Sequence, residues 1–135
     1  MTLEKVIFLD RDGVINRDSP DYIKNSDEFE FLPGSLAALR LLTEKGYRLI
    51  VITNQSIINR GWVPQAVLDH THRRLREAVA AAGGRIFDIF FCPHRPDENC
   101  VCRKPRPGLI EQACARHGID PADSIMIGDS AKDIL

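Results

Sequence analysis

The sequence predicts an α/β protein with a doubly wound, Rossmann-like parallel sheet. Short apolar runs alternate along the chain with longer segments whose apolar residues recur at helical spacing. The run Leu49-Ile50-Val51-Ile52 is apolar throughout instead of alternating, which is typical of a parallel strand covered on both faces. A strand, a helix and a strand in succession also imply a right-handed crossover.

Length and composition restrict the possible class of protein. A chain of 135 residues predicts a single domain spanning 1–135. Its 44% apolar and 27% charged residues are typical of a soluble globular protein, and a net charge of -1 gives no attraction to nucleic acid or to an anionic membrane. Because the chain has no membrane-length apolar run and no recognisable signal peptide, we expect a cytoplasmic protein. Separately, we expect a monomer.

The individual elements follow from local signals. We expect strands at 6–9, 47–53, 85–91 and 123–128, and helices at 35–45, 64–82 and 107–117. Ser35 is the expected N-cap of the first helix, and Gly46 and Gly118 are expected to end the first and third helices. In the second helix, His70 and His72 have no partner at metal-ligand spacing, so both are interpreted as surface or packing residues.

The first expected strand ends in the acidic segment Asp10-Arg11-Asp12-Gly13. Ligand sites in open α/β sheets lie past the carboxyl ends of the strands, and Gly13 allows a sharp turn there. An ordinary polar turn is the alternative interpretation. The polar loop at 16–31 should overhang this edge, unless it is only a solvated connection.

Polar residues also follow the second and fourth expected strands. The segment Thr53-Asn54-Gln55-Ser56 could hold phosphate oxygens or could simply cap a strand end. Asp129 and Asp133 follow the last strand. Carboxylates gathered at one edge repel one another unless a cation lies among them, and all-oxygen ligation favours Mg²⁺. A carboxylate there can attack phosphorus, and a second one can transfer the proton.

Three of the four cysteines lie close to one histidine between residues 92 and 102. Cys92, His94, Cys100 and Cys102 form a ligand set suited to tetrahedral Zn²⁺. Four protein ligands leave no open position, so the zinc would be structural and would stabilise its loop by about 10 kcal/mol, as in zinc-finger peptides. Free or buried cysteines are the alternative, and Cys114 is interpreted as a small buried hydrophobe.

A basic, proline-rich turn, Arg103-Lys104-Pro105-Arg106, follows the last of these cysteines. Its cations could clamp an anion, offset the negative charge of a zinc–thiolate cluster, or do both. A different class of function, a zinc-stabilised nucleic-acid-binding module, would use Arg95 with these cations. The net charge and the absence of interleaved aromatic residues argue against that class.

The order of these motifs resembles the haloacid dehalogenase superfamily of phosphatases. The resemblance rests on Asp-x-Asp-Gly at residues 10–13, Thr53, Lys104-Pro105 and Gly128-Asp129. The phrases Thr53-Asn54-Gln55-Ser56, Cys92-Pro93-His94 and Cys102-Arg103-Lys104-Pro105 are similar to one branch, which acts on heptose bisphosphate or histidinol phosphate. Arg60-Gly61 and Pro107-Gly108 are more like the heptose enzymes, so removal of the 7-phosphate of D-glycero-D-manno-heptose 1,7-bisphosphate in lipopolysaccharide-core synthesis is the first interpretation and histidinol phosphatase the alternative.

The resemblance also implies the roles of individual residues. Asp10 would be the nucleophile and Asp12 the general acid/base, with Thr53 and Lys104 holding the phosphoryl group. Mg²⁺ would be bound by the side chains of Asp10 and Asp129 and by the backbone carbonyl of Asp12. The substrate would contact a set of loop residues: Asp18, Ser19, Pro20, Asp21, Asn54, Gln55, Ser56 and Arg103. The implied partner is a small phosphorylated sugar, with Zn²⁺ held by Cys92, His94, Cys100 and Cys102.

The sequence departs from the family pattern at Ile57-Ile58-Asn59, where relatives often have Gly-Ile-Ala. This departure puts the substrate in question more than the reaction. The loops after the first and third strands are too short for a large cap domain, so we expect a minimal cap and an open site. The sequence stops soon after the fourth strand, and we therefore expect that a C-terminal segment is missing.

Overall fold

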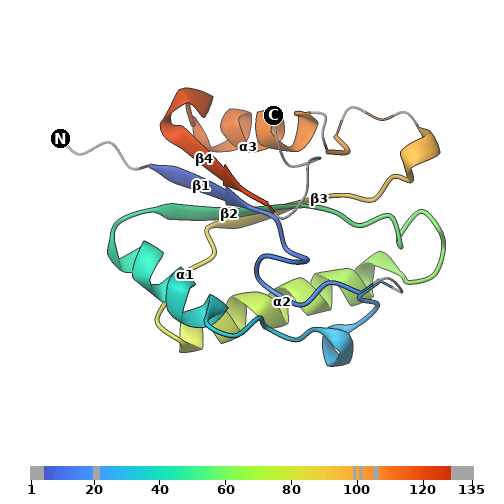
Figure 1. The fold of residues 1–135 in the computed structure, drawn as a ribbon. Helices are drawn as coiled ribbons and strands as arrows, with labels where there is room; N and C mark the ends of the chain where they lie inside the picture. Colours follow the sequence, from blue (N-terminus) through green and yellow to red (C-terminus); the bar gives the residue numbers. More distant parts are fainter. Residues whose placement is uncertain (1–4, 20–21, 99, 101, 105–106, 129–135) are drawn as a thin grey trace.

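A parallel sheet forms the centre of the molecule (Figure 1). The computed structural model describes residues 5–19, 22–98, 100, 102–104 and 107–128. Within these residues the sheet has four strands in the order β3-β2-β1-β4, and every pairing is parallel. The strands are β1 (Val6–Leu9), β2 (Arg48–Asn54), β3 (Asp88–Cys92) and β4 (Ser124–Ile127). The predicted parallel α/β class is confirmed.

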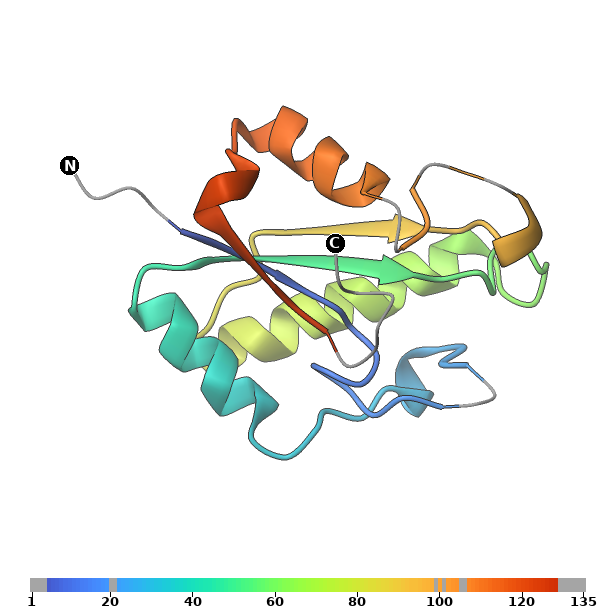
Figure 2. The same cartoon turned by 45° about the horizontal axis from the view of Figure 1, so that its top comes forward.

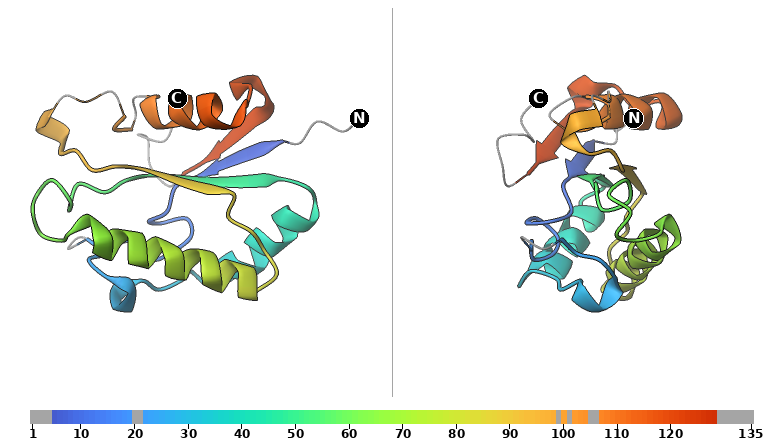
Figure 3. Two further views of the ribbon diagram at one scale, coloured as in Figure 1. Left: turned by 180° about the vertical axis from the view of Figure 1, so that it is seen from behind. Right: turned by 90° about the vertical axis from the view of Figure 1, so that its right-hand side faces the viewer.

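Helices cover both faces of this sheet. Helices α1 (Ser35–Glu44) and α2 (Gln65–Ala81) lie on one face, and α3 (Gly108–His117) lies on the other (Figures 1 and 3). Short 3₁₀ helices interrupt the connecting loops: η1 (Ser26–Glu28), η2 (Pro96–Glu98) and η3 (Pro121–Asp123). None of the helices in the described part of the chain is long and apolar enough to cross a membrane.

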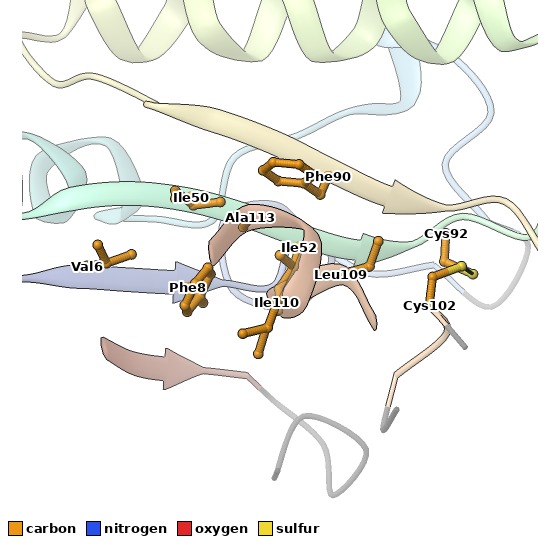
Figure 4. Packing of buried hydrophobic residues seen from close by; sticks show 10 residues of the cluster. All are labelled: Val6, Phe8, Ile50, Ile52, Phe90, Cys92, Cys102, Leu109, Ile110 and Ala113. Carbon is orange, nitrogen blue, oxygen red and sulfur yellow. Dashed lines mark hydrogen bonds between the residues drawn. The ribbon is translucent and has the colours of Figure 1, made fainter. Parts of the chain in front are cut away.

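The pleat of β1 divides the core between the two faces. Val6 and Phe8 pack into the cluster that includes Leu109 of α3 (Figure 4), whereas Ile7 and Leu9 pack against α1 and α2. The same alternation holds in β2, whose residues 49–53 are all buried. An apolar run without polar alternation is therefore required here because both faces of the strand are covered.

Two local predictions were wrong. Ser35 is the first residue of α1 and not its N-cap, because Gly34 occupies the cap position with a φ of 82°. Strand β3 begins at Asp88 and not at Arg85. The Arg85 N–H donates to Thr43 Oγ1, 3.1 Å away, so this segment is held against the end of α1 before it joins the sheet. The predicted helix ends are confirmed, since Gly46 and Gly118 both have positive φ.

Strand β4 is the strand that pairs with β1 on the side away from β2. Its Ile125 and Ile127 are 50% and 38% exposed, and they pair in register with Ile7 and Leu9. Apolar surface of β4 is thus exposed beside β1. Asp129 and Asp133, predicted to follow this strand, lie outside the described residues.

The carboxyl ends of the strands point to one edge of the molecule. Beyond this edge lie the loop after β1, the segment after β2 and the loop between β3 and α3 (Figure 2). The Asp10 N–H donates to the Ile127 carbonyl at 3.0 Å, so the ends of β1 and β4 are also adjacent. Because all four strands run in parallel, residues far apart in the sequence meet at this edge.

Candidate active site

An ion pair between Asp10 and Lys104 lies at the centre of the candidate site. Lys104 Nζ is 3.0 Å from Asp10 Oδ1, and the two residues are only 4% and 5% exposed. The Arg11 N–H donates to the same carboxylate oxygen at 2.8 Å. A buried ammonium beside a buried carboxylate is costly unless each offsets the other's charge, so their pairing fixes both side chains.

Asp12 is held by three side chains, two from the loop after β1 and one from the segment after β2. Asn16 Nδ2 donates to its Oδ1 at 2.9 Å, and Gln55 Nε2 donates to its Oδ2 at 3.1 Å. Arg11 Nε donates to Oδ1 at 2.9 Å, and Arg11 Nη2 forms an ion pair with the same oxygen at 2.8 Å. The carboxylate therefore has a fixed orientation at the end of β1.

A histidine of α2 completes the surroundings of Arg11. His72 Nε2 lies 3.1 Å from Arg11 Nη1, and both side chains are buried. Burial, and after it the charge of Arg11, lowers the pKa of His72 to about 3. The imidazole is therefore neutral, and its Nε2 accepts the hydrogen bond. His70, two residues earlier, is exposed.

The predicted segment after β2 joins Asp12 to Lys104. Gln55 Nε2 donates to Thr53 Oγ1 at 2.9 Å as well as to Asp12. The Lys104 N–H donates to Asn54 Oδ1 at 3.0 Å, and Asn54 Nδ2 donates to the Lys104 carbonyl at 3.4 Å. The structure thus brings Asp10, Asp12, Thr53 and Lys104 together at one edge, as the sequence predicted.

The loop after β1 reaches the loop after β2 at a contact that sequence reasoning missed. The rings of Tyr22 and Trp62 meet edge to face, with centroids 5.2 Å apart. The Arg60 guanidinium lies over both rings, and its Nε donates to Ser56 Oγ at 3.1 Å. Of the predicted substrate loop, Asp18 is exposed and Ser19 half-buried, whereas Pro20 and Asp21 lie outside the described residues.

The ligand atoms of the predicted zinc site lie together at the end of β3. The sulfur atoms of Cys92, Cys100 and Cys102 and a ring nitrogen of His94 all lie within 4.8 Å of one another. The sulfur–sulfur distances are 2.8, 3.5 and 3.7 Å, and Figure 4 shows Cys92 facing Cys102. Tetrahedral zinc with bonds of about 2.3 Å to sulfur spaces its sulfurs by roughly 3.8 Å, so the site suits zinc after a small expansion.

The thiols of this cluster differ in acidity. Burial, together with the neighbouring thiols, raises the pKa of Cys92, and burial also raises the pKa of Cys102. Burial also acts to raise the pKa of Cys100. Hydrogen bonds from the Arg103 N–H and with the other thiols outweigh it and lower this pKa to about 7. Metal binding here must therefore displace protons from at least the two buried thiols.

The basic residues that the structure describes around the cluster do not form a free cationic patch. Arg95 pairs with Asp97 and Glu98, Arg103 Nη1 donates to the His94 carbonyl at 3.0 Å, and Lys104 is buried against Asp10. Arg106 lies outside the described residues. These contacts argue against the nucleic-acid-binding alternative, because a phosphate backbone needs accessible cations.

The fold and this carboxylate–lysine site define a class of protein. A family model for haloacid dehalogenase-like hydrolases matches residues 15–135, and the chain belongs to this family. The predicted superfamily is therefore confirmed.

Three similar proteins are named as heptose bisphosphate phosphatases. The chain is 47% identical over 129 residues to the D-glycero-beta-D-manno-heptose-1,7-bisphosphate 7-phosphatase of Pseudomonas aeruginosa, covering 96% of this chain and 72% of that protein. It is 43% identical over 136 residues to the enzyme of the same name from Helicobacter pylori, covering 100% of this chain and 78% of that one. The crystal structure of the D,D-heptose 1,7-bisphosphate phosphatase of Bordetella bronchiseptica, complexed with magnesium and phosphate, superimposes with a TM-score of 0.92. That structure has 43% sequence identity and covers 96% of this chain and 73% of its own.

Proposed function

We propose that this enzyme removes the 7-phosphate of D-glycero-β-D-manno-heptose 1,7-bisphosphate. The buried Asp10–Lys104 pair at the carboxyl edge of the sheet carries the proposal, because it places a nucleophilic carboxylate beside a cation that can hold a phosphoryl group. The names of the similar enzymes support this substrate and this anomer. Histidinol phosphate is the alternative substrate for the same chemistry.

In the first step, a carboxylate oxygen of Asp10 attacks phosphorus and the bond between phosphorus and the sugar oxygen breaks. Asp12 gives its proton to the departing sugar oxygen, and an aspartyl-phosphate is left on Asp10. In the second step, Asp12 takes a proton from water, and the water oxygen attacks the aspartyl-phosphate to release inorganic phosphate. Lys104 and Thr53 hold the phosphoryl oxygens in both steps.

The oxygen donors at this edge fit Mg²⁺. The Asp10 carboxylate and the Asp12 backbone carbonyl both lie just after β1, and carboxylate and carbonyl oxygens are ligands that suit Mg²⁺. We assign Asp129 as the third protein ligand, because β4 ends beside Asp10. When bound, Mg²⁺ neutralises charge on the phosphoryl group. The magnesium and phosphate in the similar Bordetella enzyme support this assignment.

The loops around the edge would contact the sugar. We assign this role to Asp18, Ser19, Pro20 and Asp21 in the loop after β1, to Asn54, Gln55 and Ser56 after β2, and to Arg103. The contact between Tyr22 and Trp62 supports the assignment, since it holds the first loop beside the second. Ile57 is buried at 1% exposure, so this departure from the family pattern directs its side chain into the protein.

We propose that Cys92, His94, Cys100 and Cys102 bind structural Zn²⁺. The sulfur–sulfur distances support this assignment. Four protein ligands would leave no coordination position on the zinc for substrate. Thiolates hold zinc only while they remain reduced, which supports action in the cytoplasm, and we propose that the enzyme acts there as a monomer.

The experiment is phosphate release from the α and β anomers of the heptose bisphosphate and from histidinol phosphate, each with Mg²⁺ and with EDTA. We expect Mg²⁺-dependent release from the β anomer at a kcat/KM at least about tenfold above that on the other substrates, a difference of about 1.4 kcal/mol in transition-state binding. A preference for histidinol phosphate would overturn the substrate and keep the mechanism.

The mechanism is tested by Asp10→Asn, with the exposed α2 variant Asp69→Asn as the control. We expect Asp10→Asn to abolish turnover and the control to retain it. Acid quenching of the native enzyme during turnover should trap phosphate on the peptide that contains Asp10. Urea unfolding confirms that each variant is folded, because breaking a buried ion pair can destabilise a protein by about 3–5 kcal/mol. Turnover by folded Asp10→Asn would refute the proposed nucleophile.

A further inference from the structure

Arg11 carries a charge in a place where charge is costly. Its side chain is completely buried, and it forms an ion pair with Asp12, the next residue in the chain. Nε and Nη2 contact Asp12 Oδ1, and Nη1 contacts His72 Nε2, 3.1 Å away. Its guanidinium also lies 5.6 Å from the centre of the Phe29 ring. A buried guanidinium needs each of these partners, because water cannot replace them.

The direction of the contact with His72 follows from chemistry alone. A guanidinium has only donors, so Nη1 donates and His72 Nε2 accepts. The imidazole must then be neutral with its proton on Nδ1. His72 thus fixes the far end of the guanidinium, whose near end holds Asp12.

This arrangement makes the two oxygens of Asp12 unequal. Oδ1 accepts hydrogen bonds from Asn16 Nδ2 and from Arg11 Nε, both at 2.9 Å, and Arg11 Nη2 lies 2.8 Å away in an ion pair. Oδ2 receives one hydrogen bond among the described residues, from Gln55 Nε2 at 3.1 Å. An oxygen that accepts two hydrogen bonds has no lone pair left for a proton, so a proton on Asp12 must be carried by Oδ2.

We propose that His72 is a positioning residue for proton transfer: by holding Arg11 against Asp12 Oδ1, it makes Asp12 Oδ2 the oxygen that exchanges the proton with the leaving group and with water. The inference rests on the proposed aspartyl-phosphate chemistry. It assigns a function to a buried histidine of α2, a helix on the face of the sheet.

A merely structural role for His72 predicts a different result. If His72 only packs, its replacement should lower stability, and any loss of activity should be the same for all phosphomonoesters. If His72 positions the proton donor, the loss depends on the leaving group. A sugar alkoxide needs a proton to depart, whereas nitrophenolate does not.

The experiment compares His72→Leu, His72→Gln and His72→Asn, with the exposed His70→Leu as the matched control on the same helix. The Gln amide oxygen can reach the position of Nε2 and accept from Arg11, whereas the shorter Asn cannot. The measurement is kcat/KM, which reports aspartyl-phosphate formation, for the sugar bisphosphate and for nitrophenyl phosphate. Urea unfolding measures the stability of each variant.

We expect His72→Leu and His72→Asn to lower kcat/KM for the sugar phosphate about 10- to 100-fold, part of the usual contribution of general acid catalysis, and to lower it less than about threefold for nitrophenyl phosphate. His72→Gln should restore most of the sugar phosphate activity, and His70→Leu should change neither value. If His72→Leu does not fold, the Gln and Asn pair gives the same comparison.

Equal losses on the two phosphates, or a Gln variant no better than the Asn variant, would overturn the inference. The unmodified enzyme tests the proposed function separately. If it hydrolyses another sugar phosphate but not the heptose bisphosphate, the proposed substrate fails, and the His72 comparison is made on the sugar phosphate that it does hydrolyse.

Discussion

The buried imidazole of His72 should make the folded protein sensitive to acid. Burial, and then the charge of Arg11, lowers its pKa to about 3, whereas an unfolded chain has a histidine pKa of about 6.5. The facing charges are Arg11, Asp12 and Arg76. Because the folded state resists protonation, the unfolded state binds more protons below pH 6.5. Stability from this group is therefore complete above pH 6.5 and decreases as the pH falls toward 3.

The size of the effect at pH 5 can be calculated from these two values. At pH 5 the unfolded histidine is mostly protonated and the folded one is not, so the free energy of unfolding should drop by about 2 kcal/mol relative to pH 7. This result depends little on the folded pKa, since pH 5 lies well above it. Most of the drop therefore comes from the ordinary titration of the unfolded chain.

The assay is urea unfolding of the native protein, His72→Gln and His70→Gln at pH 7 and pH 5. The Gln side chain keeps an acceptor for Arg11 but does not titrate. The pH-dependent loss should therefore be about 2 kcal/mol smaller in His72→Gln than in the native protein, and His70→Gln should match the native protein. Other carboxylates and the metal ligands titrate equally in all three proteins. The same loss in His72→Gln as in the native protein would refute a neutral, buried His72.

Two further predictions concern Asp88 in β3 and the Cys/His cluster. His117 Nε2 donates to Asp88 Oδ2 at 2.7 Å; burial opposes the shift, but this bond and the Ile89 N–H lower the Asp88 pKa. Asp88→Asn should lower the free energy of unfolding, measured with urea at pH 7, by about 1 kcal/mol. The difference between the variant and the native protein should shrink as the pH falls below about 4 and Asp88 becomes protonated. An unchanged difference at low pH would contradict this prediction. Cys102→Ser should reduce the bound zinc from about one per chain. It should also lower kcat at least about tenfold even in excess Mg²⁺, because Lys104 lies only two residues after this ligand; full activity without zinc would show that the two sites are independent.

Much of the fold could be predicted because its signals are local. The uninterrupted apolar run of β2 required cover on both faces, and α1/α2 and α3 provide it. The glycines at 46 and 118 were predicted as helix ends because positive φ favours glycine. The ligand atoms of the Cys and His residues near β3 also lie together as predicted, since their spacing in the sequence already placed them on one short loop.

The errors came from places where a neighbour in space decides the outcome. Serine is a preferred N-cap residue, but Gly34, with its positive φ, occupies the N-cap position, so the cap lies one residue earlier than predicted. Strand β3 begins three residues later than predicted because Thr43 Oγ1, at the end of α1, accepts a hydrogen bond from the Arg85 N–H. The position of β4 beside β1 is likewise a long-range pairing for which no local pattern gives a signal.

The contact between Arg11 and His72 illustrates the same limit at the site. The two residues are 61 positions apart, and a single histidine in a helix gives no sign of a partner. One available signal was Arg11 itself, since an arginine between two aspartates at the end of a buried strand must also be buried and must find acceptors. A search for a nearby neutral acceptor on the amphipathic helix would have named His72.

The loop contacts suggest why a structural metal at the Cys/His cluster would be useful so close to the proposed active site. Lys104 is held at its backbone by Asn54 and at its ammonium by Asp10. The Gln55 N–H donates to the Cys92 carbonyl at 2.7 Å, so the residue that binds Asp12 is tied to the first cysteine of the cluster. A short loop without a metal would have to order these groups against its own conformational entropy. Four ligands on a single ion can instead fix the lysine and the glutamine together, and both would then be in place before the substrate arrives.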